Sequence, residues 1–274
     1  MLIAALAVMA GAAAANKYDN TDTIVVARDG TGEFRTIGEA VEVCRAFMDY
    51  TKVIYVKRGL YKEKLTVPQW LTNIEIVGED RDETIITYDD HANIRMPETG
   101  RPMGTFRTFT VRVQGSGITF KNITIENNAA QIGQAVALHT EGDRLTFVNC
   151  RLLGNQDTIY TGNGGTRLFF KDCLIEGTTD FIFGPSTAWF ENCDIHSRRN
   201  SYITAASTPK GCEVRLRVQP LPADRQRGCQ QGIPWPPLAR LWLHAVHELR
   251  DGRTHSPRRL APLGEAARAN RPLP

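Results

Sequence analysis

The chain has 274 residues, enough for one sizeable domain or for a domain with a tail. Its net charge of +3 is divided unevenly: residues 212–274 carry eleven Arg, no Lys and five acidic residues, a net of +6, so the first 211 residues carry −3. A weakly acidic main body offers no basis for nucleic-acid binding, and we expect no nucleic-acid partner.

The N-terminal segment 1–15 is typical of a secretory signal peptide. The sequence MLIAALAVMAGAAAAN is a short apolar run that ends in small residues, with a cleavage point expected near Ala13–Ala15. It lacks the basic start of such leaders, so Met1 need not be the true initiator. The run is too short to span a bilayer, and the alternative is the start of an ordinary buried helix. We predict a signal peptide at 1–15, secretion to the extracellular or periplasmic side, and no membrane partner.

Short β-type runs and one helix are predicted in the next part of the chain. Strands are expected in TIVVARDG from Thr23, in KVIYVKRGLYKEKLTV from Lys52 and in NIEIVGED from Asn73. Between the first two runs, FRTIGEAVEVCRAFM (34–48) has apolar residues at helical spacing. We expect this helix to cap the open end of a core.

Four later segments align with one another: ITFKNITIEN, LTFVNCRLLG, LFFKDCLIEG and AWFENCDIHS. Their shared phenylalanines recur about every 20 to 27 residues, a period typical of a coil of parallel strands with one rung per repeat. Leucine-rich repeats have a similar period, but their L-x-x-L-x-L pattern is absent. The fold predicted is an all-β, right-handed, single-stranded parallel β-helix with an N-terminal capping helix. The aligned phenylalanines are Phe120, Phe147, Phe170 and Phe190, and the stacked turn residues are Asn122, Asn149, Asp172 and Asn192.

The six cysteines show no C-x-x-C spacing of a zinc or redox site. Cys150, Cys173 and Cys193 fall at one position of the repeat, which favours stacked, buried thiols. Secretion into an oxidising compartment leaves a disulfide open as the alternative.

Two carboxylates recur with the rung period. The interval from Asp157 to Asp180 equals the interval from Phe147 to Phe170, and Gln134 lies the same interval before Asp157, with Gln156 next to it. Because neighbouring rungs lie about 4.8 Å apart, we expect these side chains on one face of successive rungs. Two carboxylates that close do not both ionise easily, so one can act as a nucleophile while the other holds a proton. The two amides can donate to an oxyanion.

The alternative interpretation is a ladder of Asp residues that cap turns, since Asp beside Thr is ordinary turn chemistry. Either carboxylate alone is explained equally well in this way. The two glutamines on the same period favour a catalytic group.

The motifs around these residues closely resemble the pectin methylesterases, or pectinesterases. The resemblance rests on GQAVALHT, GNQDTIY and GTTDFIFG, with GTGEFRTIGEAV and RGLYKEKL upstream, and it runs in order from about Thr23 to Gly211. It implies a secreted aspartyl esterase that hydrolyses the C6 methyl ester of galacturonan without cofactor or metal. The implied partner is methyl-esterified homogalacturonan (pectin), and we expect a monomer.

The resemblance also implies roles for individual residues. Asp180 would be the nucleophile, and Asp157 would protonate methanol and then activate water. Gln134 and Gln156 would stabilise the oxyanion. Thr105, in GTFRTF, resembles a substrate contact, and Phe181 and Phe183 are candidates for an apolar groove wall, with the core as the alternative for either.

Rival functions remain among polysaccharide-active β-helices. A pectate lyase would need a carboxylate cluster for calcium and a basic residue, and a glycoside hydrolase would need carboxylates flanking a glycosidic bond. Neither explains the paired glutamines. A non-catalytic pectin-binding β-helix is the alternative from another class.

The C-terminal segment 212–274 does not continue the repeat. It contains no Phe, no Tyr and nine of the fourteen Pro, which do not fit a central strand. The family continues beyond the region equivalent to ITAASTPKG with further rungs and a GRPW motif whose Arg and Trp complete the active site, and no in-register match is present here. The incomplete domain is therefore predicted at 16–211, followed by a disordered tail.

A shifted reading frame accounts for this tail. With permitted synonymous codons, RLRVQPLPADR from Arg215 can be read in another frame as Gly-Tyr-Val-Phe-Ser-His-Cys-Arg-Leu-Thr-Ala, and QRGCQQGIPWPPL as a segment ending in Gly-Arg-Pro-Trp. We interpret 212–274 as out of frame after a shift between about Thr208 and Arg215. A genuine Pro/Arg-rich linker or binding tail is the rival. The loss of the Arg and of the covering rungs predicts poor folding and low esterase activity for the chain as written.

Overall fold

The computed structural model describes residues 17–20, 22–207 and 216–219. The predicted signal peptide and most of the predicted tail lie outside the described residues. In the described part of the chain, no helix is long and apolar enough to cross a membrane.

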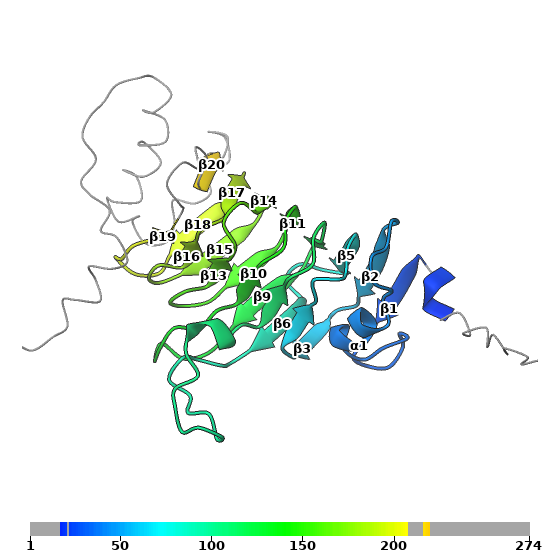
Figure 1. Cartoon of the computed structure of the whole chain (residues 1–274), viewed down its shortest axis with the longest axis horizontal. Coiled ribbons are helices and arrows are strands. Elements are labelled where there is room, and N and C mark those ends of the chain that lie inside the picture. Colours follow the sequence, from blue (N-terminus) through cyan, green and yellow to red (C-terminus); the bar gives the residue numbers. More distant parts are fainter. Residues whose placement is uncertain (1–16, 21, 208–215, 220–274) are drawn as a thin grey trace, which may run out of the picture.

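Three parallel sheets form the described structure, and successive strands pass from one sheet to the next. Each strand pairs with the strand one rung later, so that the chain winds as the predicted parallel β-helix. Figure 1 shows this coil as an elongated stack that runs from β1 at its blue end to β17 at its yellow end.

The first sheet contains the aligned phenylalanine segments. Its strands, in spatial order, are β1 (Thr23–Val26), β2 (Lys52–Val56), β5 (Ile74–Gly78), β8 (Thr119–Lys121), β11 (Leu145–Val148), β14 (Arg167–Lys171), β17 (Thr187–Glu191) and β20 (Leu216–Gln219). The early strands confirm the rungs predicted near Thr23, Lys52 and Asn73.

The second and third sheets complete each rung. The second contains β3 (Gly59–Lys62), β6 (Thr84–Tyr88), β9 (Thr124–Asn127), β12 (Arg151–Leu153), β15 (Leu174–Gly177) and β18 (Asp194–Ser197). The third contains β4 (Leu65–Val67), β7 (Val111–Val113), β10 (Leu138–Thr140), β13 (Ile159–Thr161), β16 (Ile182–Gly184) and β19 (Thr204–Ala206).

The predicted phenylalanine ladder forms the centre of the core. Phe147 pairs with Phe120 on one side and with Phe170 on the other, and Phe170 pairs with Phe190. The rings stack with centroids 5.4, 4.8 and 4.7 Å apart, and all four are at most 1% exposed. Side chains alternate between the two faces of each strand, and the register of the strands places all four rings on the inner face. The rings therefore form one continuous stack although they are unequally spaced in the sequence.

The turn after each phenylalanine strand has a left-handed backbone. Asn122, Asn149, Asp172 and Asn192 have φ values of 52°, 51°, 54° and 53°. Asn and Asp tolerate this conformation better than other non-glycine residues. The Asn149 amide donates to Asn122 Oδ1 at 2.9 Å, and the Asn192 amide donates to Asp172. The ladder of turns is thus linked from rung to rung.

The three cysteines of the repeat are buried free thiols, as predicted. Cys150, Cys173 and Cys193 are 0%, 2% and 6% exposed, and none forms a disulfide. They fill the core beside the phenylalanine ladder.

The capping helix is shorter than predicted. Helix α1 spans Ile37–Glu42, and Thr36 and Glu39 form a capping box at its start. Its apolar face packs on the core, beside β1 in Figure 1. The helix ends at Glu42 with Val43 as its C-cap, and further along Phe47 has φ 53° and its N–H donates to Trp70 O. A one-turn 3-10 helix, η1 (Lys17–Asn20), precedes β1.

The structure differs from the expectation for four residues of the tail. Leu216–Gln219 were expected to carry no rung, yet they form β20, which pairs in parallel with β17. The first sheet therefore extends by one strand beyond the last rung that was predicted from the repeat.

Candidate active site

Asp157 and Asp180 lie on successive rungs, just before β13 and β16. Ile159 pairs with Ile182, and this pair is offset in the sequence by the same amount as the two carboxylates. The Asp157 N–H donates to Thr179 O at 3.2 Å, and the Asp180 N–H donates to Tyr202 O at 2.7 Å. The backbone ladder thus brings the two acidic residues together at the N-terminal ends of β13 and β16.

Both acidic residues occupy the left-handed region, with φ 68° at Asp157 and φ 49° at Asp180. This conformation costs on the order of 1 kcal/mol for a non-glycine residue, and Asp is one of the residues that adopt it most readily. The turn residues of the phenylalanine ladder share this conformation, so it does not by itself distinguish the two carboxylates.

The two carboxylates have different environments. Asp157 is 9% exposed, and burial, with a smaller contribution from the charge of Asp180, raises its pKa to about 7. Asp180 is more accessible, and burial raises its pKa as well. Among the described residues, no hydrogen-bond donor or basic group lowers the pKa of either carboxyl. Because its pKa lies near neutrality, Asp157 can both hold and release a proton at neutral pH.

The two glutamines meet the site in a register that differs from the prediction. Leu138 pairs with Ile159, and these two residues are closer in the sequence than Asp157 and Asp180 are. The difference arises because the N–H groups of both Ala137 and Leu138 donate to the same acceptor, Thr158 O. The Ala135 N–H donates to Gln156 O at 3.1 Å. The prediction that Gln134 and Asp157 occupy the same position on neighbouring rungs is therefore wrong. Gln134 lies beside Gln156 rather than beside Asp157.

A cavity of about 490 Å³ lies over the third sheet, lined in part by His139 of β10 and Tyr160 of β13. Neither the two carboxylates nor the two glutamines line it. Tyr160, which lines the cavity, contacts three other rings: Phe106 at 4.8 Å, His139 at 4.8 Å and Phe183 at 4.9 Å between centroids. The lining residues are Met103, Gly104, Thr105, Phe106, Arg107, Arg112, His139, Glu141, Tyr160, Gly162 and Asn163.

The two candidate wall residues have different positions. Phe183 is half-buried on the outer face, against Tyr160. Phe181 is completely buried in the hydrophobic core, so it takes the core position that was the alternative for either residue. It packs so closely on Gly177 that a Cβ there would lie 2.2 Å from the Phe181 Cβ.

A polar cluster forms the floor of the cavity. Glu141 accepts hydrogen bonds from Arg112 Nε at 3.0 Å, from His139 Nε2 at 3.0 Å and from Gln114 Nε2 at 2.9 Å. Burial opposes ionisation of Glu141, but the bonds from Gln114 and Arg112 hold its pKa below the usual range. Burial also lowers the pKa of His139. At neutral pH the floor therefore pairs the Glu141 carboxylate with the Arg112 guanidinium, beside a neutral His139.

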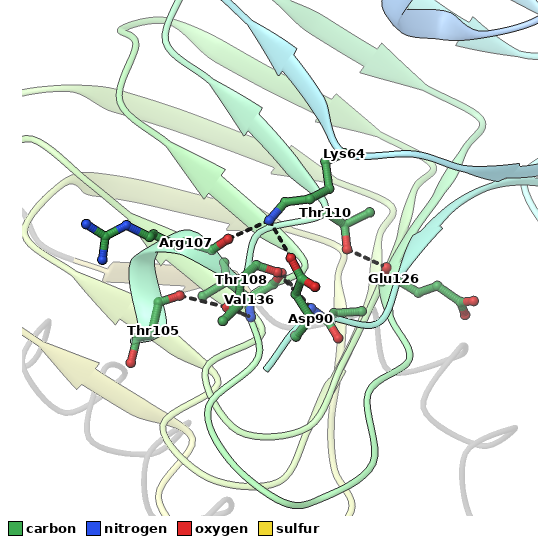
Figure 2. A network of polar contacts seen from close by, with 9 residues as sticks. Lys64, Asp90, Thr105, Arg107, Thr108, Thr110, Glu126 and Val136 are labelled. Atoms are coloured by element: carbon green, nitrogen blue, oxygen red, sulfur yellow. Dashed lines mark hydrogen bonds and ion pairs between the residues drawn. The ribbon is translucent and has the colours of Figure 1, made fainter. Parts of the chain in front are cut away.

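Thr105 lies at the start of η2 (Thr105–Arg107), a short 3-10 helix in the loop between β6 and β7. Figure 2 shows how this helix is attached: Thr108 Oγ1 donates to Thr105 O at 2.7 Å and accepts from the Val136 N–H at 2.9 Å. Val136 is two residues after Gln134. The helix that carries Thr105 is thus fixed to the segment that carries Gln134.

The sequence interpretation missed several residues that line the cavity, among them His139 and Tyr160. A signal was present: each lies between two buried residues of its strand, so alternation directs it to the outer face. Only a rung-by-rung alignment of the third sheet would have brought them together with Phe183. In the described part of the chain, no three His, Cys, Asp or Glu side chains form a metal-binding group.

Comparison with known proteins gives consistent matches. The family model Pectinesterase matches residues 23–211. A probable pectinesterase/pectinesterase inhibitor of Brassica napus is 37% identical over 234 residues, which cover 79% of this chain and 39% of that protein. The chain thus spans about 40% of the length of the first curated relatives it matches.

Solved structures match as well. Pectin methylesterase from carrot aligns with a TM-score of 0.65 and 33% identity, covering 77% of this chain and 66% of the other. A pectin methylesterase in complex with a hexasaccharide aligns with a TM-score of 0.64 and 31% identity, covering 72% of this chain and 66% of the other.

Proposed function

Because the chain belongs to the pectinesterase family, we propose that its site hydrolyses the C6 methyl esters of galacturonan, releasing methanol and demethylated pectin. The observation that carries the proposal is the pair Asp157 and Asp180 on successive rungs, with the pKa of Asp157 raised to about 7. One carboxylate can then attack while the other holds a proton. The hexasaccharide in complex with a related pectin methylesterase supports a polysaccharide as the ligand.

In the proposed first step, an Asp180 carboxylate oxygen attacks the ester carbonyl carbon. The negative charge that develops on the carbonyl oxygen is stabilised by the side-chain amides of Gln134 and Gln156. Protonated Asp157 donates its proton to the methoxy oxygen as the C–O bond breaks, so methanol leaves as a neutral molecule. The product of this step is an acyl-enzyme anhydride at Asp180.

In the proposed second step, Asp157 is an ionised carboxylate and acts as a base. It removes a proton from a water molecule, which attacks the acyl carbonyl, and Asp180 leaves as a carboxylate. Asp157 is again protonated, and the galacturonic acid product loses its remaining proton to the solvent and is released as a carboxylate. The residues require no cofactor for either step.

The cavity supplies the neighbouring binding surface. Tyr160 and Phe106 line it with aromatic rings, Phe183 packs against Tyr160, and Thr105 adds a hydroxyl group to the lining. A cavity of about 490 Å³ is large enough for a sugar residue of the polymer. We propose that the protein acts as a secreted monomer on the methyl-esterified polymer.

We further propose that the chain as written has low activity. An arginine at the site would hold the nucleophile ionised, and in the described residues no basic group lowers the pKa of Asp180. The Gly-Arg-Pro-Trp segment that can be read in another frame would supply it. A protein that binds the polymer without turnover is the second candidate, and the same observation favours it.

The test compares two genes, one as written and one with the reading frame restored between Thr208 and Arg215. Purified proteins are assayed on methyl-esterified homogalacturonan for methanol, for unsaturated product and for new reducing ends. We expect methanol alone, at a rate at least 100-fold higher for the restored frame, with Asp180→Ala inactive in both. Unsaturated product or new reducing ends would refute the ester-hydrolysis proposal in favour of a lyase or a glycosidase. Equal methanol release from both proteins would refute the proposed impairment.

A further inference from the structure

The loop between β6 and β7, residues 89–110 and here called the cavity loop, is unusually long for a connection within a β-helix. It carries η2 and supplies Thr105 and Phe106 to the cavity. Figure 1 shows it, in blue-green, projecting from the coil. Connections of this length without a strand are usually functional, and closing their two ends costs conformational entropy.

Lys64 joins the two ends of this loop. It lies between β3 and β4, one rung before the loop, and its Nζ donates to Asp90 Oδ2 at 2.5 Å and to Arg107 O at 2.6 Å. Figure 2 shows the ammonium group between these two acceptors. The Lys64 and Asp90 side chains are 28% and 17% exposed, and Nζ also lies 4.8 Å from the centre of the Phe109 ring. A charge this sheltered is screened less by water than a surface pair.

Both attachment points are close to residues of the site. Arg107 O is the last carbonyl of η2, which has no partner within the helix. The next residue, Thr108, bonds both Thr105 O and the Val136 N–H. At the other end, the Ala92 N–H, two residues after Asp90, donates to Gln134 O at 2.8 Å.

We propose that Lys64 is a positioning residue for substrate binding. Its ammonium group binds both ends of the cavity loop and so holds in place the part of the loop that lines the cavity. The ligand is a galacturonate unit of the polymer, so this inference rests on the proposed function. Lys64 does not touch the reacting atoms. Its loss loosens the wall that carries Thr105 and Phe106, and the affinity for the polymer falls.

Lys62 provides a matched control on the preceding strand. It forms an ion pair with Asp89 at 3.0 Å, and its Nζ lies 5.8 Å from the Tyr88 ring, whereas Lys64 lies 5.6 Å from the same ring. Its side chain and that of Asp89 are 55% and 50% exposed. Lys62 therefore has the same charge and a similar neighbourhood, but its ion pair is exposed and reaches only the first end of the loop.

The experiment uses the full chain with Lys64→Met, Lys64→Arg and Lys62→Met. Isothermal calorimetry measures binding of a methyl-esterified oligogalacturonide, and hydrogen exchange measures protection of the Arg107 and Thr108 amides. We expect Lys64→Met to weaken binding about tenfold and to accelerate exchange at both amides. We expect the affinity of Lys62→Met for the oligogalacturonide to stay within twofold of that of the parent. Lys64→Arg can donate to both acceptors, so we expect it to keep most of the parent's affinity.

Parent-like binding and exchange in Lys64→Met would overturn the proposal. Circular dichroism monitors folding, and if Lys64→Met does not fold, Asp90→Ala, which removes the side-chain acceptor of Lys64 at the first end of the loop, replaces it with the same two expectations. A parent chain that binds no oligogalacturonide would refute the proposed function. The exchange comparison between Lys64→Met and Lys62→Met would then still decide whether Lys64 holds the loop.

Discussion

Replacing Asp157 by Asn should make the protein more stable above neutral pH while it removes the proposed acid. Asp157 is 9% exposed and has a pKa of about 7 in the folded state, against an ordinary value of 3.8. The folded state therefore binds the proton more tightly than the unfolded state does. Stability from this group is complete below pH 4 and is lost as the pH rises through 7.

The magnitude follows from the two pKa values. Each pKa unit corresponds to 1.36 kcal/mol, so a pKa near 7 in place of 3.8 means that Asp157 lowers the free energy of unfolding at high pH by at most about 4 kcal/mol. Asn carries no charge at any of these pH values, so Asp157→Asn does not lose this stability. We expect its free energy of unfolding to exceed that of the parent by about 2–4 kcal/mol at pH 8 and to equal it near pH 3.

The assay is urea denaturation of both proteins from pH 3 to pH 8, followed by circular dichroism. Asp143→Asn is a control of opposite sign, because the bond from Arg167, together with smaller contributions, lowers the pKa of Asp143 to about 2. That variant should be less stable than the parent above pH 4. Parallel stability curves for the parent and Asp157→Asn between pH 4 and pH 8 would refute the reasoning.

Three further predictions concern the site and its support. Asp180→Asn should lower the pKa of Asp157 below 7 but leave it above 3.8, because burial remains the larger cause; a carbon-13 NMR titration with an unchanged pKa would contradict this. Phe181→Ala should cost about 3–5 kcal/mol of unfolding free energy and Phe183→Ala much less, since only Phe181 is fully buried; equal losses in urea would be evidence against this assignment. Asn149→Ala should cost about 1–2 kcal/mol through its φ of 51° and its lost hydrogen bond, and Asn149→Gly less; thermal unfolding that ranks the two in reverse would count against the turn argument.

The fold was predictable because its signals are local. Apolar and polar residues alternate along each short strand, and Asn or Asp follows each phenylalanine at a left-handed turn. Both signals act within about five residues, and their recurrence implies stacking whatever the lengths of the intervening loops. The register of the phenylalanine ladder was therefore predictable even though its spacings in the sequence are unequal.

The site was predictable where it followed the same rung. Asp157 and Asp180 are separated by the offset of β13 and β16, so their neighbourhood could be inferred from spacing. Gln134 could not be placed in this way. The N–H groups of Ala137 and Leu138 both donate to Thr158 O, so the pairing of β10 with β13 is shifted by a residue or two from the regular rung interval. The spacing of residues in the sequence does not reveal this shift.

By itself the sequence determined the coil, the pair of carboxylates and the family motifs, because each depends on residues close in the chain or on a regular repeat. Only the tertiary structure decided that Phe181 is core while Phe183 lies half-buried against Tyr160, and that His139 and Tyr160 line the cavity. It alone brought Lys64 to Asp90 and Arg107, which are 26 and 43 residues away. Such contacts depend on how a long loop folds back on the rungs, and the energy that selects one arrangement comes from packing and buried hydrogen bonds rather than from local preference.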